Sequence, residues 1–201
     1  MALDFTIRNT QTEWMDDLDC HGEIVDQTLR ELGTINKLLG GNAVTLRGLD
    51  KLISRYSISK DQVIHFADIG CGGGDMLIEI EKWADRRGIK VKLTGIDANA
   101  NIVEYARKHC AAHDRISFKT ANVLSPEFAN EKYDIITGIL FFHHFESKCL
   151  EQLFASLLRQ ASMGLVINDL HRHWFGYHSI KILTKLFSRS PMVQEDGPLS
   201  V

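Results

Sequence analysis

The stretch DIGCGGGDM, residues 68–76, decides the fold of this chain. It contains four glycines and continues VIHFADI (63–69), an apolar run typical of a buried strand. Gly70, Gly72 and Gly74 allow a sharp turn and a close approach of the backbone to a ligand, because glycine has no side chain that would clash. A helical pattern begins after the turn, so the free N–H groups of a helix N-terminus would point to the same place. The stretch therefore predicts a strand–turn–helix unit with a ligand at its turn.

Segments typical of strands alternate along the chain with segments whose apolar residues have helical spacing. We expect strands at 63–69, 91–97, 115–123, 133–142 and 163–170. We expect helices at 20–39, 44–55, 76–87, 101–113, 147–159 and 176–187. This alternation predicts an α/β fold, a Rossmann-like, doubly wound, mostly parallel sheet with helices on both faces. We place an N-terminal helical cap at 1–58 and the sheet domain at 59–201.

The composition is that of an ordinary globular protein, with 201 residues, 44% hydrophobic and 24% charged, and a formal net charge of −3. A nucleic-acid partner is not expected, because phosphate binding needs a basic face. No apolar run is long enough to span a bilayer, and the N-terminus lacks the features of a signal peptide. We therefore expect a cytoplasmic protein without membrane insertion. No metal site is predicted, and the cysteines, which lack CxxC spacing, are expected to be reduced thiols at positions 20, 71, 110 and 149.

The glycine stretch fits neither of two common nucleotide-binding motifs. A dinucleotide fingerprint would need a glycine where Asp75 stands, and a P-loop would need a lysine that is absent. Carboxylates at Asp68 and Asp75 would repel a pyrophosphate, whereas they would not repel a ligand with an ammonium group. A glycine-rich turn without any ligand is the alternative interpretation.

DIGCGGG resembles the first motif of class I S-adenosylmethionine (SAM) dependent methyltransferases, and the expected elements from about 63 to 170 follow in that family's order. The resemblance implies SAM as cofactor and S-adenosylhomocysteine as product. It implies that the glycine loop wraps the methionine and ribose, and that Asp97 binds the ribose hydroxyls through charge-assisted hydrogen bonds. The alternative role for Asp97 is to cap the next helix. The loop residues concerned are Asp68, Gly70, Cys71, Gly72 and Gly74.

Further cofactor contacts that the resemblance implies lie at the ends of the next strands. Ala98 would line the adenosine, and Asn122 and Val123 would lie beside the adenine, with a loop cap as the alternative role for Asn122. Ile139 would pass the sulfonium. One of the two phenylalanines that follow could face this cation, with plain core packing as the alternative.

The pair His143-His144 resembles a histidine pair that recurs in the small-molecule branch of the family. This branch includes methyltransferases of ubiquinone and menaquinone biosynthesis. The implied reaction is methyl transfer to an oxygen or carbon atom of a small aromatic, quinone-like or polyketide-type molecule. A histidine is the natural base for the acceptor's proton near neutral pH, and His144 and His171 are the preferred catalytic candidates. The alternative role of each histidine is a structural hydrogen bond, and Asp169 and Asn168 could orient such a histidine or touch the substrate.

The family sheet usually has seven strands, and this sequence ends at GPLSV (197–201), where the last two would not yet have begun. We therefore expect a truncated form or a domain without those strands. An exposed sheet edge would invite pairing with another chain, so a homodimer is a possibility. Two other functions stay open, a non-catalytic SAM-binding protein and an NAD(P)-dependent oxidoreductase, although the missing third glycine of the dinucleotide motif disfavours the latter.

Overall fold

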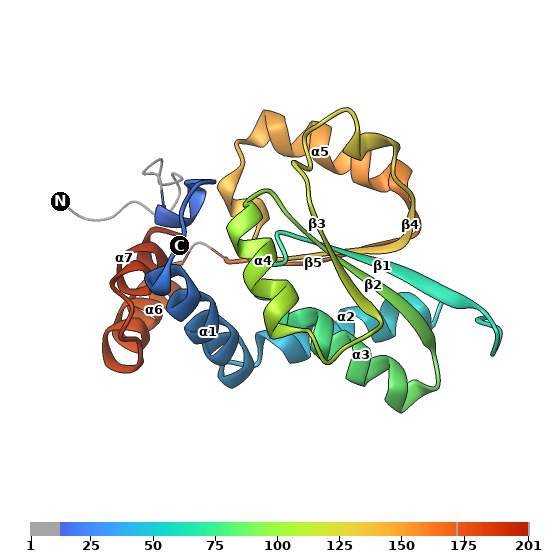
Figure 1. Ribbon diagram of the computed structural model, residues 1–201, viewed down its shortest axis with the longest axis horizontal. Coiled ribbons are helices and arrows are strands. Elements are labelled where there is room, and N and C mark those ends of the chain that lie inside the picture. Colours follow the sequence, from blue (N-terminus) through green and yellow to red (C-terminus); the bar gives the residue numbers. More distant parts are fainter. Residues whose placement is uncertain (1–12, 172, 201) are drawn as a thin grey trace.

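Five strands form a single parallel sheet in the computed structural model, which describes residues 13–171 and 173–200. The strand order is β3-β2-β1-β4-β5, and every neighbouring pair runs parallel, as Figure 1 shows. The strands are β1 (Val63–Ile69), β2 (Lys90–Asp97), β3 (Ile116–Thr120), β4 (Tyr133–Ile139) and β5 (Ala161–Asn168). The chain runs outward from β1 to β3 and then returns to β4 beside β1. The switch in strand order therefore lies between β1 and β4, where ligands of such sheets bind.

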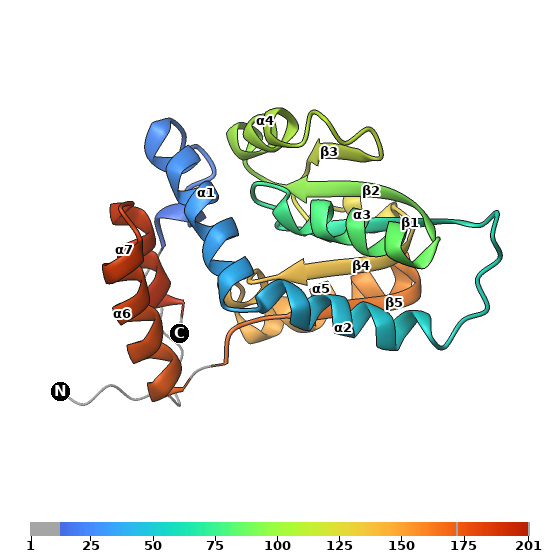
Figure 2. The same cartoon turned by 90° about the horizontal axis from the view of Figure 1, so that it is seen from below.

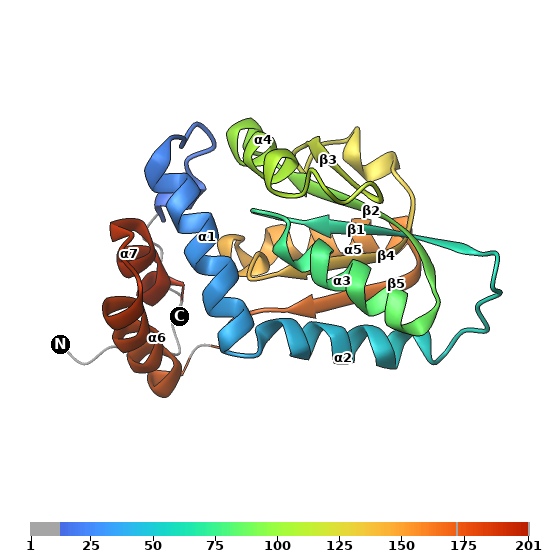
Figure 3. The same ribbon diagram turned by 60° about the horizontal axis from the view of Figure 1, so that its bottom comes forward.

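Helices cover both faces of the sheet, so the predicted fold class is confirmed. In Figure 3, α2 (Gly41–Ile53) and α3 (Asp75–Arg87) cover one face, and α5 (Ser147–Gln160) lies behind the other. Helix α4 (Ala100–His109) packs beside β2 and β3. The 3₁₀ helix η2 (Phe128–Asn130) packs against α5.

Alternate residues of the strands enter two separate apolar cores. In β1, Ile64 and Phe66 pack with α2 and α3, whereas Ala67 and Ile69 pack on the α5 side. All four side chains are completely buried. Burial on both faces explains why the strand reads as an almost continuous apolar run in the sequence.

A cap of helices stands at the carboxyl ends of the strands, as Figure 2 shows. It consists of the 3₁₀ helix η1 (Trp14–Asp16), α1 (Glu23–Leu38), α6 (Trp174–Phe187) and α7 (Pro191–Leu199). The cap therefore combines η1 and α1 of the predicted N-terminal segment with two helices from the end of the sequence, whereas α2 belongs to the sheet layers and residues 1–12 lie outside the described ranges.

Hydrogen bonds tie the two ends of the chain together within the cap. Thr28 Oγ1 of α1 lies 2.6 Å from Ser190 Oγ, the hydroxyl that caps α7. Glu31 of α1 accepts bonds from the backbone N–H groups of Arg189 and Ser190, at 3.1 and 3.2 Å. Asp196 of α7 accepts bonds from two backbone N–H groups of η1. These contacts fix α7 across the carboxyl edge of the sheet.

Several predicted boundaries differ from the observed ones, and one helix was missed. The strand expected at 115–123 is only Ile116–Thr120, and the helix expected at 101–113 ends at His109. Helix α7 was not predicted, because Gly197 and Pro198 in its last turns look like helix breakers. Its start does carry the usual signals, a serine N-cap followed by proline at the first helical position. Among the helices in the described ranges, none has the length and apolar character needed to cross a bilayer.

Candidate functional site

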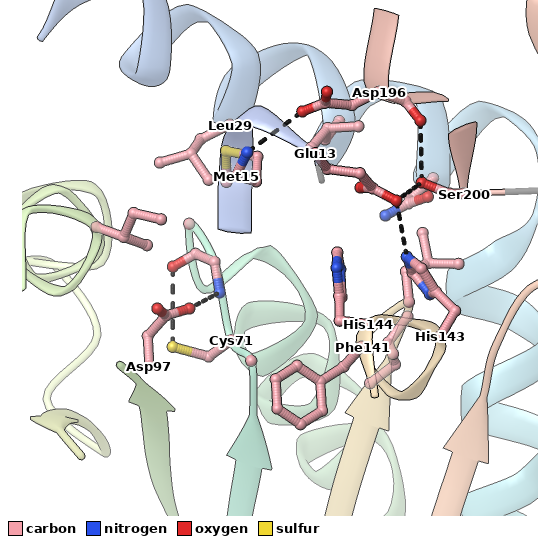
Figure 4. A pocket seen from close by; sticks show the side chains of 18 of the residues that line it. Glu13, Met15, Leu29, Cys71, Asp97, Phe141, His143, His144, Asp196 and Ser200 are labelled. Atoms are coloured by element: carbon pink, nitrogen blue, oxygen red, sulfur yellow. Dashed lines mark hydrogen bonds and ion pairs between the residues drawn. The ribbon is translucent and has the colours of Figure 1, made fainter. Parts of the chain in front are cut away.

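A cavity of about 670 Å³ lies between the carboxyl ends of the strands and the cap. Figure 4 shows side chains converging on it from β1, β2, β4 and the cap. Most of the predicted site residues line it, namely Asp68, Gly70, Cys71, Gly72, Asp97, Ala98, Asn122, Val123, Ile139 and His144. Within the part of the chain that the structure describes, Gly74 and His171 do not belong to the lining. The structure thus brings the predicted residues of four strand ends to one place.

The glycine loop has the left-handed backbone that its sequence suggests. Gly70 has a φ of 64° and Gly72 a φ of 49°, and both line the cavity. A Cβ on Gly70 would lie 2.2 Å from Cδ2 of Phe141, so this position is closed to larger residues on steric grounds as well. Gly74, with a φ of 81°, is the N-cap of α3, and a Cβ there would lie 2.8 Å from Cys110 Sγ. The third glycine therefore serves packing against α4.

Asp97 ends β2 with its carboxylate at the cavity. Its Oδ2 accepts a bond from Gly72 N at 3.3 Å, and its Oδ1 accepts one from Asn99 N at 3.0 Å. Burial raises the pKa of this carboxyl, while the backbone N–H groups act in the opposite direction. The N-cap of α4 is Asn99, whose side chain accepts from Asn101 N and Ile102 N. Asp97 is thus not the helix cap, and its carboxylate connects the glycine loop to β2.

Asp68 lies beneath the loop and is almost completely buried, with 3% of its surface exposed. Its Oδ1 accepts a bond from Thr137 Oγ1 of β4 at 2.6 Å. Burial, more than any other cause, raises the pKa of the Asp68 carboxyl to about 7. This carboxyl therefore links the two central strands at the switch point.

Helix α1 closes the loop side of the cavity. A Cβ on Gly33 would lie 2.6 Å from Cγ of Asp75, so the helix passes this carboxylate at a distance that only glycine permits. Leu29 of α1 lies against Gly72. Three carboxylates line this half of the cavity, those of Asp68, Asp75 and Asp97, and the Asp75 side chain keeps 40% of its surface exposed.

Asn122 and Val123, which follow β3, both line the cavity. The side-chain oxygen of Asn122 accepts a bond from Leu124 N at 2.9 Å, which is the loop-cap role considered as its alternative. Val123 is buried and belongs to the apolar core on the α5 side. Their place in the lining is compatible with a flat ring beside them.

The end of β4 turns sharply into the 3₁₀ helix η3 (Phe142–His144). Leu140 has a φ of 51°, the one left-handed non-glycine residue of the described chain. Its N–H donates to Asn168 O of β5 at 2.9 Å, which holds the turn in place. The two phenylalanines that follow separate: Phe141 lines the cavity over Gly70, whereas Phe142 is buried in the core.

Two histidines of η3 line the far half of the cavity, each with a carboxylate at its Nδ1 atom. His143 Nδ1 lies 2.6 Å from Asp169 Oδ1, and His144 Nδ1 lies 2.8 Å from Asp16 Oδ1. Asp169 also accepts from the backbone N–H groups of Phe142 and His143, at 2.7 and 3.1 Å. Asp169 follows β5 and orients a histidine, as was considered from the sequence. Asn168 instead donates to Gly41 O and Thr45 Oγ1 of α2.

The cap supplies acidic groups to this half that the sequence did not reveal. Glu13 Oε1 lies 4.0 Å from His143 Nε2 and accepts a bond from Ser200 Oγ at 2.8 Å. Burial raises the pKa of Glu13 and lowers the pKa of His144. The only signal for Glu13 was the acidic character of residues 13–17, and nothing in the sequence places them near His143.

His171 lies elsewhere. Its side chain is exposed, and its ring stacks with that of His173 at 6.1 Å between centroids. Although it follows β5 by only a few residues, the chain there leaves the carboxyl edge toward α6. Of the two candidate catalytic histidines, His144 lines the cavity and His171 does not.

Comparison with known proteins identifies the central part of the chain. A family model described as "Methyltransferase domain" matches residues 66–164. No curated protein sequence matches the chain significantly.

Solved structures of methyltransferases share the fold. The plantazolicin methyltransferase BpumL, in complex with a triazolic desmethylPZN analog and SAH, has 22% identity and a TM-score of 0.58 over 87% of this chain and 63% of that structure. The DszA carbon methyltransferase has 14% identity and a TM-score of 0.58 over 70% and 39%. A putative SAM-dependent methyltransferase from Methanococcus maripaludis has 18% identity and a TM-score of 0.50 over 71% and 62%. The chain thus spans less than two thirds of the length of each.

Proposed function

Since this chain belongs to the class I SAM-dependent methyltransferases, we propose that it transfers a methyl group from SAM to an oxygen or carbon atom of a small aromatic, quinone-like or polyketide-type molecule. The observation that carries the proposal is the single cavity at the switch point, which joins the glycine loop and Asp97 to His143 and His144. The glycine loop and Asp97 are suited to a nucleoside with a cationic group. His143 and His144 are suited to an acceptor that must lose a proton.

In the proposed complex, SAM lies across the carboxyl ends of β1 and β2. Asp97 would accept hydrogen bonds from the two ribose hydroxyls, because its carboxylate borders the cavity and has lone pairs beyond the two used by backbone N–H groups. Gly70 and Gly72 would let the loop approach the methionine part of SAM. Ala98, Asn122 and Val123 would border the adenosine.

The sulfonium would lie between the loop and the end of β4. Ile139 and Phe141 border this part of the cavity, and the Phe141 ring offers a π face to a cation. The carboxylates of Asp68 and Asp75 add negative charge or hydrogen-bond acceptors nearby, which suits the positive charges of the SAM sulfonium and ammonium.

The acceptor would occupy the half of the cavity next to η3 and the cap. Its walls there include apolar side chains of α1 with its C-cap, α6 and α7, namely Leu32, Ile35, Leu39, Ile180, Met192 and Val193. Apolar walls with a few convergent polar groups are typical of sites for small organic molecules, and a volume of about 670 Å³ lies within the usual range. The DszA carbon methyltransferase and the plantazolicin methyltransferase share the fold around such a site.

Methyl transfer is an in-line displacement in which the acceptor atom bonds to the methyl carbon while the carbon–sulfur bond breaks. Because the sulfonium is already a good leaving group, the protein must mainly align three atoms, an effect worth up to about 7–11 kcal/mol in ideal cases. A phenol or enol acceptor must also lose its proton. His143 and His144 stand at the end of the cavity where this proton would be removed, and Asp169 and Asp16 hold their rings.

Isotope transfer tests the proposal. The protein is incubated with SAM that carries a labelled methyl group and with a small-molecule extract, and products are identified by mass spectrometry. We expect a labelled low-molecular-weight product that is lost in Asp97→Ala. Binding of SAM without any labelled product would instead favour the non-catalytic SAM-binding protein, and quenching of NADH fluorescence would favour the oxidoreductase.

A further inference from the structure

Three potential metal ligands converge at the acceptor end of the cavity. One ring nitrogen of His143, one of His144 and a carboxylate oxygen of Glu13 all lie within 4.8 Å of one another. The side chains are largely shielded, with exposed fractions of 15% for His143, 23% for His144 and 11% for Glu13. Figure 4 shows both imidazoles directed toward Glu13 from below while Glu13 approaches from the cap.

Hydrogen bonds behind the cluster fix which atoms face its centre. A carboxylate can only accept a bond, so the Nδ1 atoms beside Asp169 and Asp16 carry the hydrogen when these rings are neutral. That tautomer leaves the Nε2 atom of each ring with its lone pair. A histidine that donates its other N–H to a carboxylate is the arrangement that metal-binding histidines usually have. Both histidines of the cluster have it.

Glu13 is held in a similar way. Ser200 Oγ lies 2.8 Å from Glu13 Oε1, to which it can donate its single hydrogen, and 3.1 Å from the backbone oxygen of Asp196. Asp16, the last residue of η1, accepts from the backbone N–H of Glu13, the N-cap of this helix, at 2.9 Å. The carboxylate of Glu13 is thus anchored from the cap while one of its oxygens stays near His143.

We propose that Glu13, His143 and His144 bind one divalent transition-metal ion at the acceptor end of the cavity. Two imidazoles and one carboxylate suit Zn²⁺ or a similar borderline ion, whereas Mg²⁺ and Ca²⁺ prefer oxygen ligands. Metal–ligand bonds of about 2.0–2.1 Å place tetrahedral ligand atoms roughly 3.3 Å apart, so binding requires a pair of ligand atoms to approach by at most about 1.5 Å. Rotation of the Glu13 side chain and small turns of the two rings supply a movement of this size.

The ion would lie where the acceptor is proposed to bind, so it could assist methyl transfer. This part of the inference rests on the proposed function. An acceptor hydroxyl that binds a metal ion loses its proton more readily. The two imidazoles would then promote proton loss through the ion that they hold. Binding of the ion itself is a separate claim and does not depend on methyl transfer.

The test is a zinc titration of the full chain after treatment with a chelator, with a chromophoric chelator as competitor. We expect one tightly bound Zn²⁺ per chain. His144→Ala and Glu13→Gln should each weaken binding by about 100-fold, and Asp16→Asn, which only loosens the ring of His144, by about 10-fold. Glu13→Gln changes little in shape, so it keeps the test decisive if His144→Ala folds poorly. A Co²⁺ spectrum without a thiolate charge-transfer band would exclude the cysteines as ligands.

The exposed pair His171 and His173 supplies the matched control, because it also consists of two neighbouring imidazoles. The double variant His171→Ala/His173→Ala should bind Zn²⁺ as tightly as the unchanged chain. Equal affinity in Glu13→Gln and the unchanged chain, or loss of binding in the control instead, would overturn the metal site. Labelled methyl transfer is measured in the same samples: full activity in zinc-free protein would reject a part for the ion in catalysis and keep the proposed function.

Discussion

The two halves of the cavity are built in different ways. The loop half, formed by the glycine loop and the ends of β1 and β2, comes mainly from residues 68–99, and its glycines and carboxylates follow one another closely in the sequence. The histidine half joins η3 to groups from the two ends of the chain, such as Glu13 and Ser200, which lie 187 residues apart. A local motif can thus specify the first half, whereas the second exists only once the cap has docked on the sheet.

The largest effect should come from the histidine half. His144→Ala should lower turnover by about 10²–10⁴-fold, the usual contribution of a group that assists proton transfer, and change SAM affinity little. Steady-state kinetics with a labelled methyl group and calorimetry with SAM measure the two quantities. His171→Ala is the control and should leave both unchanged, because this ring lies outside the cavity. Parallel losses of turnover and SAM affinity in His144→Ala would show that the halves are not functionally distinct.

Asp68 should make the stability of the loop half depend on pH. Its pKa of about 7 in the folded chain lies above the ordinary value of 3.8, so ionisation opposes folding. The stabilising contribution is complete below the unfolded pKa and is lost as the pH rises from about 4 to about 7. Asp68→Asn keeps an acceptor for Thr137 but cannot ionise, so its advantage over the unchanged chain should grow to a few kcal/mol near pH 8.

Urea unfolding of both proteins across this range checks the sign. The unchanged chain should lose stability relative to Asp68→Asn as the pH increases. A difference between the two that stays constant with pH would mean that Asp68 is ionised throughout and that burial does not hold its proton.

Asp97→Ala should weaken SAM binding by about 10- to 100-fold, as expected for hydrogen bonds to a charged group worth about 1.5–3 kcal/mol. The variant also loses the bonds from Gly72 N and Asn99 N, so part of the loss would come from a looser loop. Isothermal calorimetry measures the affinity. Asp61→Ala, at an exposed surface ion pair, serves as the control and should bind SAM normally. Unchanged affinity in Asp97→Ala would remove Asp97 from the cofactor site.

The smallest effects are expected from alanine substitutions at two glycines, which separate the cost of backbone strain from the cost of a steric contact. Gly70 and Gly88 both have a φ of 64°, but only Gly70 has a neighbour, Phe141, where a Cβ would go. Gly88→Ala should therefore cost about 1 kcal/mol of unfolding free energy from strain alone, and Gly70→Ala about 1–3 kcal/mol more. Chemical denaturation measures both. Adding Phe141→Ala to Gly70→Ala should recover the difference, and no recovery would contradict the assigned contact.

The sequence sufficed for the fold and for the loop half because the responsible signals are local. The alternation of strand and helix patterns predicted the parallel sheet. The glycines that follow β1 predicted the turn, and the structure gives them left-handed backbone conformations. Local signals do not say which glycine faces a ligand, so Gly74, which packs on Cys110, was grouped with the two that line the cavity. The same limit applies to Phe141 and Phe142. Only their contacts in the structure show that the first lines the cavity and the second is buried in the core.

The histidine half was harder to predict because it depends on contacts that are distant in the sequence. His171 and His144 both follow strand ends, yet the chain turns away after β5 and leaves His171 exposed. Asp16 and Glu13 are held at the cavity by contacts with the end of the chain, among them the bonds that Asp196 of α7 accepts from the backbone of Trp14 and Met15. Helix α7 itself was missed, so no pattern could place these acids beside the histidines.

A crystal structure of the chain with SAH would show whether the loop half holds the cofactor. We expect ribose hydroxyls within hydrogen-bond distance of the Asp97 carboxylate, the amino acid part against Gly70 and Gly72, and the sulfur facing the half that holds His143 and His144. A nucleoside bound elsewhere, or a ribose that Asp97 does not contact, would contradict this expectation.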